Sequence, residues 1–235
     1  MKLRPGLGFS AVLAVAACST SNITSIEYGD VAASVAGSTT TDVVAMADVV
    51  AIARGAPPAG FTYAAGDVCG SRGELGYSYT ITCKDTAGTV LDACDATTDT
   101  ADVTYTWAGA VDFPNLAATI TREGIWAASQ LQTQTARFDG NATLVDDDAI
   151  EGSAYHLDAT ATYTGVTLDV ASRQATGGSI ALDIDATIAM PSGADAFALT
   201  AAVSLAGGSA SIMLDQGIDY TSDLATGAIT SAGSP

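Results

Sequence analysis

Residues able to do acid–base or nucleophilic chemistry are few and scattered in this sequence. His156 is the single histidine, and on a strand it would share a face with Asp158, because side chains two positions apart point the same way. A serine hydrolase would also need a nucleophile at a strained turn, and no GxSxG segment is present. We therefore expect His156 to be a solvated strand residue, and we expect no catalytic residues and no enzyme activity.

Two acidic stretches could bind calcium through carboxylate and loop oxygens. The first consists of Asp146, Asp147 and Asp148 followed by Glu151, and the second is residues 95–102. Neither has the DxDxDG spacing of a calcium-binding loop, so solvated loops are the favoured interpretation and a weak calcium site is the alternative. Zinc is not expected, because no CxxC spacing exists and the histidine is remote. We predict no other cofactor.

Three cysteines, Cys69, Cys83 and Cys94, lie within residues 61–94. In an oxidising compartment we expect one disulfide and one free thiol. The Cys83–Cys94 pair is favoured because its loop is readily closed, with Cys69 as the rival partner. A regular hairpin through residues 85–88 would put Cys94 opposite Tyr79, too far from Cys83 to bond, whereas an irregular segment after residue 90 makes the pair easy.

The charge of the chain excludes whole classes of partner. Lys and Arg number 8 against 26 Asp and Glu, which gives a net charge of −18. Loss of the first 17 residues, with Lys2 and Arg4, would leave 6 − 26 = −20. Phosphate backbones and anionic headgroups need clustered basic residues, so we exclude nucleic acid and electrostatic attraction to anionic lipid. We interpret the charge as a source of solubility, with a cationic partner or divalent ions as the alternative.

Residues 1–17 have the form of a secretory signal peptide: a basic start, the apolar run LGFSAVLAVAA and small residues at the end. The segment Val15-Ala16-Ala17-Cys18 resembles the lipobox of bacterial lipoproteins. The resemblance, which covers only these opening residues, implies cleavage before Cys18 and its modification with diacylglycerol and an acyl chain such as palmitate, a stable membrane anchor. Ser19 in place of Asp implies the outer membrane of a Gram-negative envelope. An ordinary signal peptide with an incidental cysteine is the alternative.

A flexible tether over residues 18–27 and a helical segment over about 30–55 are predicted next. The first helical piece, residues 30–36, ends at Gly37, and the second starts after the capping oxygens of residues 39–42. Gly55 and the prolines after it end the second piece. Because that piece is apolar nearly all round, we expect it to be buried on most sides, with a β-branched strand as the alternative.

Beyond residue 61 apolar and polar side chains alternate, which is typical of strands with one buried and one solvated face. The clearest runs are residues 155–163, 180–190 and 197–205. Turn residues, among them Glu123-Gly124 and Asp146 to Asp148, separate roughly ten to twelve such strands. Asp139-Gly140 is either another turn or a bulge inside one long strand.

We therefore predict a single mainly β domain over residues 28–235. Its architecture would be a long-stranded, strongly curved antiparallel sheet or open half-barrel, with the N-terminal helix packed on its concave apolar face. A transmembrane barrel uses the same alternation, but the low aromatic content of 6% argues against it.

The favoured function is a non-catalytic structural or partner-binding scaffold in the cell envelope. The alternative is a carrier of a lipid or other apolar ligand between helix and sheet. The size of the internal cavity distinguishes the two, because ligand pockets measure roughly 300–1,000 Å³. Alanines at 159, 161, 186 and 201 on the apolar face favour close packing and therefore the scaffold.

Overall fold

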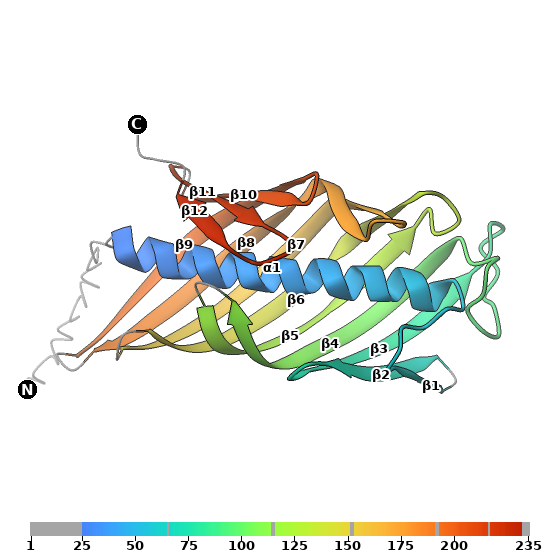
Figure 1. Cartoon of the computed structure of the whole chain (residues 1–235), viewed down its shortest axis with the longest axis horizontal. Coiled ribbons are helices and arrows are strands. Elements are labelled where there is room, and N and C mark those ends of the chain that lie inside the picture. The colour runs from blue at the N-terminus through green and yellow to red at the C-terminus, as the bar shows by residue number, and fades with distance from the viewer. Residues whose placement is uncertain are drawn as a thin grey trace, which may run out of the picture.

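The protein consists of one long helix and one antiparallel sheet (Figure 1). The structure is a computed structural model, and it describes residues 25–64, 66–113, 116–150, 153–190, 193–215 and 217–231. A mainly β fold with an N-terminal helix is therefore confirmed. The predicted signal peptide, and the predicted tether as far as residue 24, lie outside the described residues.

Helix α1 (Ser25–Ala53) is continuous, so the prediction of two helical pieces after a tether to residue 27 is wrong. Ser38 Oγ donates to the carbonyl of Val35 and Thr41 Oγ1 to that of Gly37, each over 3.1 Å. These hydroxyls bond to the carbonyls of their own helix instead of capping a new helix start. The glycine at 37 and the Ser/Thr residues that follow it, which predicted a break, therefore lie within a continuous helix.

The C-terminus of α1 follows the sequence prediction closely. Gly55 has φ +76°, and its N–H donates to Ile52 over 2.9 Å, while the N–H of Ala56 donates to Ala51 over 2.9 Å. This pair of bonds is a Schellman motif, in which glycine takes the left-handed position at no steric cost.

Most of α1 is buried in the fold. By length and composition residues 28–53 could also cross a membrane, but 89% of the most apolar stretch is buried inside the protein. The core helix of a soluble protein and a signal sequence can both have this length and composition.

Twelve strands follow in the described residues, and each is hydrogen-bonded to its neighbours in chain order, antiparallel throughout. No pairing joins β1 to β12 in that part of the chain, so the sheet is open. The strands are β1 (Thr62–Ala64), β2 (Asp67–Arg72), β3 (Leu75–Lys84), β4 (Thr100–Phe113), β5 (Leu116–Ser129), β6 (Thr135–Ile150), β7 (Ser153–Asp169), β8 (Gln174–Met190), β9 (Gly193–Ala206), β10 (Ser209–Leu214), β11 (Ile218–Asp223) and β12 (Ile229–Ser231).

Two glycine-containing segments expected to be turns lie inside strands. Gly124 is within β5, where a Cβ would lie 2.5 Å from the carbonyl oxygen of Asn141. Gly140 is within β6, where a Cβ would lie 2.1 Å from the carbonyl oxygen of Ile125. These glycines allow close approach of neighbouring strands, so a turn at Glu123-Gly124 is wrong. The register shifts between Phe138 and Gly140, which makes Asp139-Gly140 the bulge.

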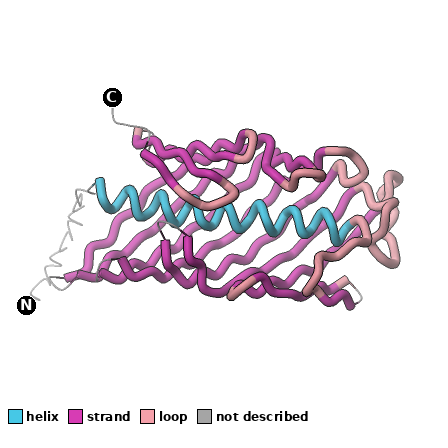
Figure 2. The backbone as a smooth tube through the Cα atoms, viewed as in Figure 1, coloured by secondary structure: helices cyan, strands magenta, loops and turns pink. Residues whose placement is uncertain are grey.

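The alternation of side chains divides the sheet into a buried and a solvated face. In β7, Leu157, Ala159 and Ala161 are buried, whereas His156 and Asp158 are exposed. Buried residues of the sheet and of α1 form one hydrophobic cluster. Among the described residues the exposed large apolar side chains are those of Val90, Ile125 and Met213. Most of the described loops lie at the end of the sheet where α1 ends (Figure 2).

Candidate functional site

An ion pair is buried near the middle of α1. Asp42 of α1 and Arg122 of β5 are 0% and 1% exposed, and Arg122 Nη2 lies 2.7 Å from Asp42 Oδ2. Tyr163 of β7 donates its hydroxyl to Asp42 Oδ2 over 2.6 Å, and Trp107 of β4 donates Nε1–H to Oδ1 over 3.0 Å. Donors from three strands therefore converge on one helix carboxylate.

The protonation of this cluster follows from its burial and from its charges. Burial is the largest single influence and would lower the pKa of Arg122, but the attraction of Asp42, together with the interactions with Tyr163 and Tyr105, outweighs burial and raises that pKa, so the guanidinium stays charged. Burial raises the pKa of Tyr163 well above its usual range, which keeps the hydroxyl protonated as a donor. Because Asp42 and Arg122 are covered, the pair joins helix to sheet and is not open to a substrate.

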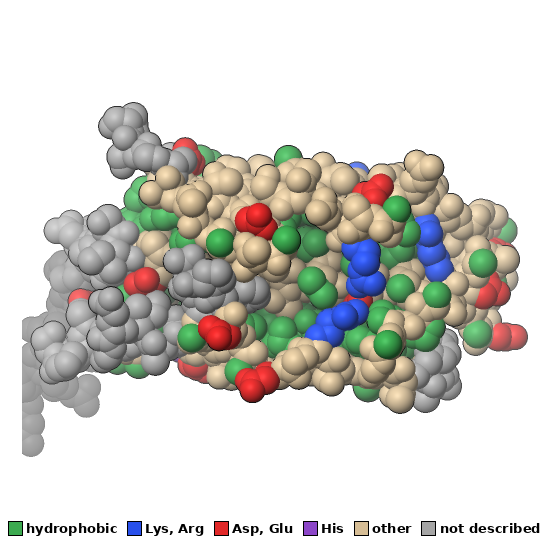
Figure 3. Space-filling view, in the orientation of Figure 1, with side chains coloured by type: hydrophobic (Ala, Val, Ile, Leu, Met, Phe, Trp, Pro, Cys, Tyr) green, Lys and Arg blue, Asp and Glu red, His purple; other side chains and the backbone are tan. Residues whose placement is uncertain are grey.

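A second carboxylate of α1, Asp48, binds two arginines. Arg72 of β2 reaches it through Nε (2.8 Å to Oδ2) and Nη2 (2.6 Å to Oδ1), a bidentate arrangement. Arg173, in the turn between β7 and β8, reaches Oδ1 through Nη2 at 2.5 Å. Asp48 is 0% exposed, whereas the arginine side chains are 37% and 44% exposed. Basic side chains gather over the C-terminal half of α1 (Figure 3).

A groove beside the C-terminal half of α1 is the best-formed concave site next to these arginines. It measures about 80 Å³ and continues into an open hollow of about 630 Å³, because Arg54, Asp169 and Val170 line both. Arg54 is fixed by hydrogen bonds of 2.6 Å from Nε to the carbonyl of Leu131 and from Nη2 to that of Thr133. The groove combines a charged rim with an apolar lining: Ala47, Val50, Ala51, Leu168 and Val170.

His156 lies on the outward face of β7, as predicted, with its side chain 47% exposed. Its Nδ1 lies 2.7 Å from Asp147 Oδ1 and its Nε2 lies 3.2 Å from Asp158 Oδ2. The hydrogen bond to Asp147 raises the pKa of His156 above its ordinary value, and the charges of both aspartates add to the rise. The arrangement is a solvated ion-pair group.

The aspartates expected to form a loop lie on strand β6, so the loop prediction is wrong. Asp146 is 2% exposed and accepts a hydrogen bond from Ser34 Oγ of α1. Asp147, the next residue, points to the opposite face and contacts His156. Successive side chains on a strand diverge, so Asp146 and Asp147 do not converge on one ion.

The remaining calcium candidates divide between described and undescribed residues. Asp148 belongs to β6, but its side chain, like Glu151, lies outside what the structure describes. In the second acidic stretch Asp95 Oδ1 accepts hydrogen bonds from the N–H and Oγ1–H of Thr97, at 2.7 and 2.6 Å. In the described ranges, no group of three or more His, Cys, Asp or Glu residues is placed to hold a metal ion.

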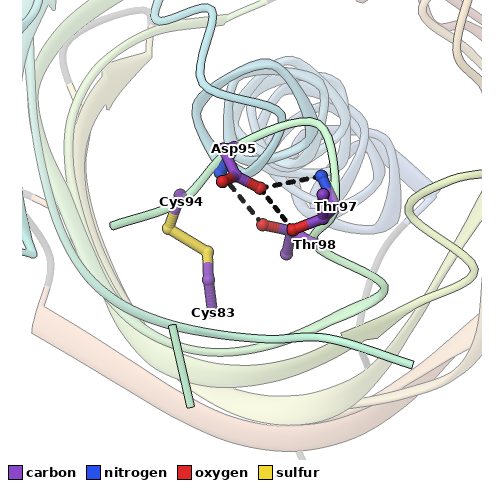
Figure 4. The surroundings of a disulfide bond; sticks show 5 residues. All are labelled: Cys83, Cys94, Asp95, Thr97 and Thr98. Carbon is purple, nitrogen blue, oxygen red and sulfur yellow. Dashed lines mark hydrogen bonds between the residues drawn. A yellow bond between two sulfur atoms is a disulfide. The ribbon is translucent and has the colours of Figure 1, made fainter. Parts of the chain in front are cut away.

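Cys83 and Cys94, the pair favoured from the sequence, form a disulfide with a Cα–Cα distance of 5.3 Å (Figure 4). Regular pairing after β3 stops at a single bridge between Lys84 and Val90. The irregular segment that follows brings Cys94 back to Cys83, which was the condition for this pairing. Cys69 is free and exposed on β2. Cys18, the predicted acylation site, lies outside the described residues.

The buried charges of α1 and β5 were missed from the sequence. Asp48 is a lone acid inside an apolar helical run. Arg122 occupies the same strand parity as the buried Ile120 and Trp126, so alternation alone places it on the apolar face. Charged residues are almost never fully buried unless paired, so each of these positions implies a partner of opposite charge elsewhere in the fold.

No family model, curated protein sequence or solved structure matches the chain. What the protein does must therefore be inferred from its own residues and their geometry.

Proposed function

We propose that this chain is an envelope lipoprotein whose β domain is a non-catalytic scaffold for a protein partner. Cleavage before Cys18 and acylation of that cysteine would anchor the domain in the outer membrane. Helix α1 begins at Ser25, so 25 − 18 = 7 residue steps would separate the anchor from the fold. These steps span at most about 25 Å, which would hold the N-terminal end of α1 close to the bilayer.

A strongly curved half-barrel, with α1 on its concave apolar face, is the shape we propose for the scaffold. The ion pairs of Asp48 support it. Strand β2 and the turn after β7 are five strand positions apart in the sheet order, which is about 24 Å across a flat sheet. Arg72 and Arg173 nevertheless both lie within 2.6 Å of the same carboxylate oxygen, which supports a sheet that bends around the helix.

The observation that carries the scaffold role is the filling of the space between helix and sheet. The cavity beneath the N-terminal part of α1 measures about 10 Å³ and the groove beside its C-terminal half about 80 Å³. Both are well below the roughly 300–1,000 Å³ of ordinary ligand pockets. A carrier of a lipid or other apolar ligand, the alternative function, would need α1 to leave its place and to break the ion pairs of Asp42 and Asp48.

Acylation is tested by labelling cells with a palmitate analogue and separating membrane from soluble fractions. The wild type should carry label and stay with the membrane, and Cys18→Ser should lose both properties. Cys69→Ser is the matched control, because Cys69 is also a free cysteine and is exposed. This substitution should leave both labelling and membrane association intact. Membrane association or labelling of Cys18→Ser equal to that of the wild type would contradict the anchor.

Native mass spectrometry of the protein purified from its host separates the scaffold from the carrier. A scaffold should carry no lipid besides its covalent acyl groups, because the space between helix and sheet is already filled. One lipid bound per chain, in addition to the covalent acyl groups, would contradict the scaffold and favour the carrier.

A further inference from the structure

Basic side chains are scarce and unevenly placed in this acidic chain. Six of the eight Lys and Arg residues follow residue 24. Half of these six, Arg54, Arg72 and Arg173, flank the C-terminal half of α1. Arg72 and Arg173 share Asp48, and Arg54 and Arg173 line the groove. Positive charge concentrated beside a concave surface raises the local concentration of anions, even on a chain with a net negative charge.

Of these three arginines, Arg173 has the most uncommitted donors. Arg54 gives two nitrogens to backbone carbonyls, and Arg72 gives two to Asp48. Arg173 makes one hydrogen bond within the described part of the chain, through Nη2, although a guanidinium has five N–H groups.

The groove offers an apolar wall beside that guanidinium. Ala47, Val50 and Ala51 come from α1, and Leu168 and Val170 come from the end of β7. Its volume of about 80 Å³ equals roughly two to three water molecules, which is room for the first few carbon atoms of an alkyl chain, and the adjoining hollow has room for the rest. The hollow that continues from it is open, so a ligand can enter from solvent.

Asp169 limits the charge of the ligand. Its carboxylate lines the groove and accepts hydrogen bonds from the N–H and Oγ–H of Ser172, at 2.7 and 2.8 Å. These bonds lower the pKa of Asp169, so the side chain stays negative. Asp169 repels any anion in the groove, but it repels a doubly charged phosphate about twice as strongly as a carboxylate with one negative charge, so a singly charged group pairs with Arg173 at less cost.

We propose that this groove binds a short-chain monocarboxylate, with the carboxylate on the free edge of Arg173 and the alkyl chain between α1 and the end of β7. A carboxylate and a guanidinium match in geometry, and two parallel hydrogen bonds fix the orientation of the ligand. The site goes beyond a scaffold role and does not depend on acylation of Cys18.

The test is a titration of the purified full chain with sodium hexanoate. Calorimetry measures the binding, and the arginine Nε–Hε NMR signals show which arginine responds. We expect one hexanoate per chain and a shift of the Arg173 signal. Hexanol, which lacks the charge, and inorganic phosphate, which lacks the chain, should both bind more weakly. Phosphate binding as tight as hexanoate would mean an adventitious ion only and would overturn the proposal, as would absence of hexanoate binding.

Two substitutions and a control locate the site. Arg173→Gln should weaken hexanoate binding about tenfold, the loss expected for a hydrogen bond to a charged group, while Arg72 keeps Asp48 paired and the fold intact. Ala51→Leu should weaken binding by filling the groove. Arg137→Gln is the control, because Arg137 is also half-exposed and paired with one aspartate, Asp139, at 2.8 Å, but does not line the groove.

Unchanged affinity in both Arg173→Gln and Ala51→Leu would overturn the proposal. Vesicles containing phosphatidylglycerol test the other source of such a group, an anionic lipid. They should not compete with hexanoate, because a headgroup held in a bilayer cannot place an alkyl chain in the groove. Competition by the vesicles would therefore also contradict a site for a free carboxylate.

Discussion

Substitution Arg122→Met should strongly destabilise the protein, because it leaves Asp42 buried without its cationic partner. The methionine keeps the apolar stem of the arginine, so the change removes mainly the charge and its hydrogen bonds. Arg122 and Asp42 are 1% and 0% exposed and 2.7 Å apart, so solvent does not screen them. Removing one partner of such a pair costs about 3–5 kcal/mol, a large part of the roughly 5–15 kcal/mol that stabilises a typical domain.

Urea denaturation, monitored by tryptophan fluorescence, measures this loss of unfolding free energy, since Trp107 and Trp126 are both buried in the core. In the double variant Asp42→Asn with Arg122→Met, asparagine keeps an acceptor for Trp107 and carries no charge. We expect this variant to regain at least about 2 kcal/mol relative to Arg122→Met, as neutral replacements of buried pairs do. A loss below about 1 kcal/mol for Arg122→Met would refute the reasoning.

The same variant has a defined pH dependence. Without Arg122, burial would raise the folded-state pKa of Asp42 further above that of the unfolded chain. The penalty should therefore be full above that raised pKa and should shrink as the pH falls through it and the carboxyl takes up a proton. A penalty that grows on acidification would contradict the assignment of a buried, uncompensated carboxylate.

Three further outcomes are expected. The hydrogen bond to Asp147 raises the folded-state pKa of His156, so its stabilisation should be complete below the unfolded value and lost as the pH rises through the folded one. Because the pair is exposed, His156→Gln should lower the unfolding free energy by at most about 1 kcal/mol at a pH below the unfolded pKa of the histidine. At a pH above its folded pKa the substitution should have no effect, and urea denaturation at the two pH values measures both results. Reduction of the disulfide, which closes a separation of 11 residues, should lower the stability by about 3 kcal/mol, and an unchanged melting temperature would contradict this. Gly140→Ala should cost about 1–3 kcal/mol, because its Cβ would lie 2.1 Å from a backbone oxygen; Gly217→Ala, which meets nothing within 4 Å, is the control and should melt like the wild type.

Strands were predictable where alternation is strict, as at Leu157, Ala159 and Ala161, because one buried face imposes a period of two. Their lengths were underestimated at Glu123-Gly124 and at Asp146 to Asp148. Those residue types favour turns locally, but pairing with neighbours on both sides keeps them in β5 and β6. In α1, too, the tertiary structure overrides a local preference. The Ser/Thr segment after Gly37 favours a helix break locally, but it stays helical because the rest of the chain buries it.

The candidate site was less predictable because its parts are far apart in the sequence. Asp42 and its partner Tyr163 are separated by 121 positions, and Asp48 and Arg173 by 125. Periodicity assigns a residue to a face, but it does not give the partner that lies across the interior. The disulfide was accessible because its cysteines are 11 positions apart and only one local irregularity decides the pairing.

The order of synthesis gives the position of α1 a further consequence. Tyr28 near its start donates a hydrogen bond of 2.9 Å to Asp215, 187 positions later. At roughly 5–20 residues per second, the ribosome would need about 10–40 s to make the residue that completes this contact. During that time the apolar helix α1 lacks the strands that bury it in the finished fold. Newly made chains would therefore be most vulnerable to self-association before β10 is complete, and a chaperone that holds the first fifty residues would have its greatest effect then.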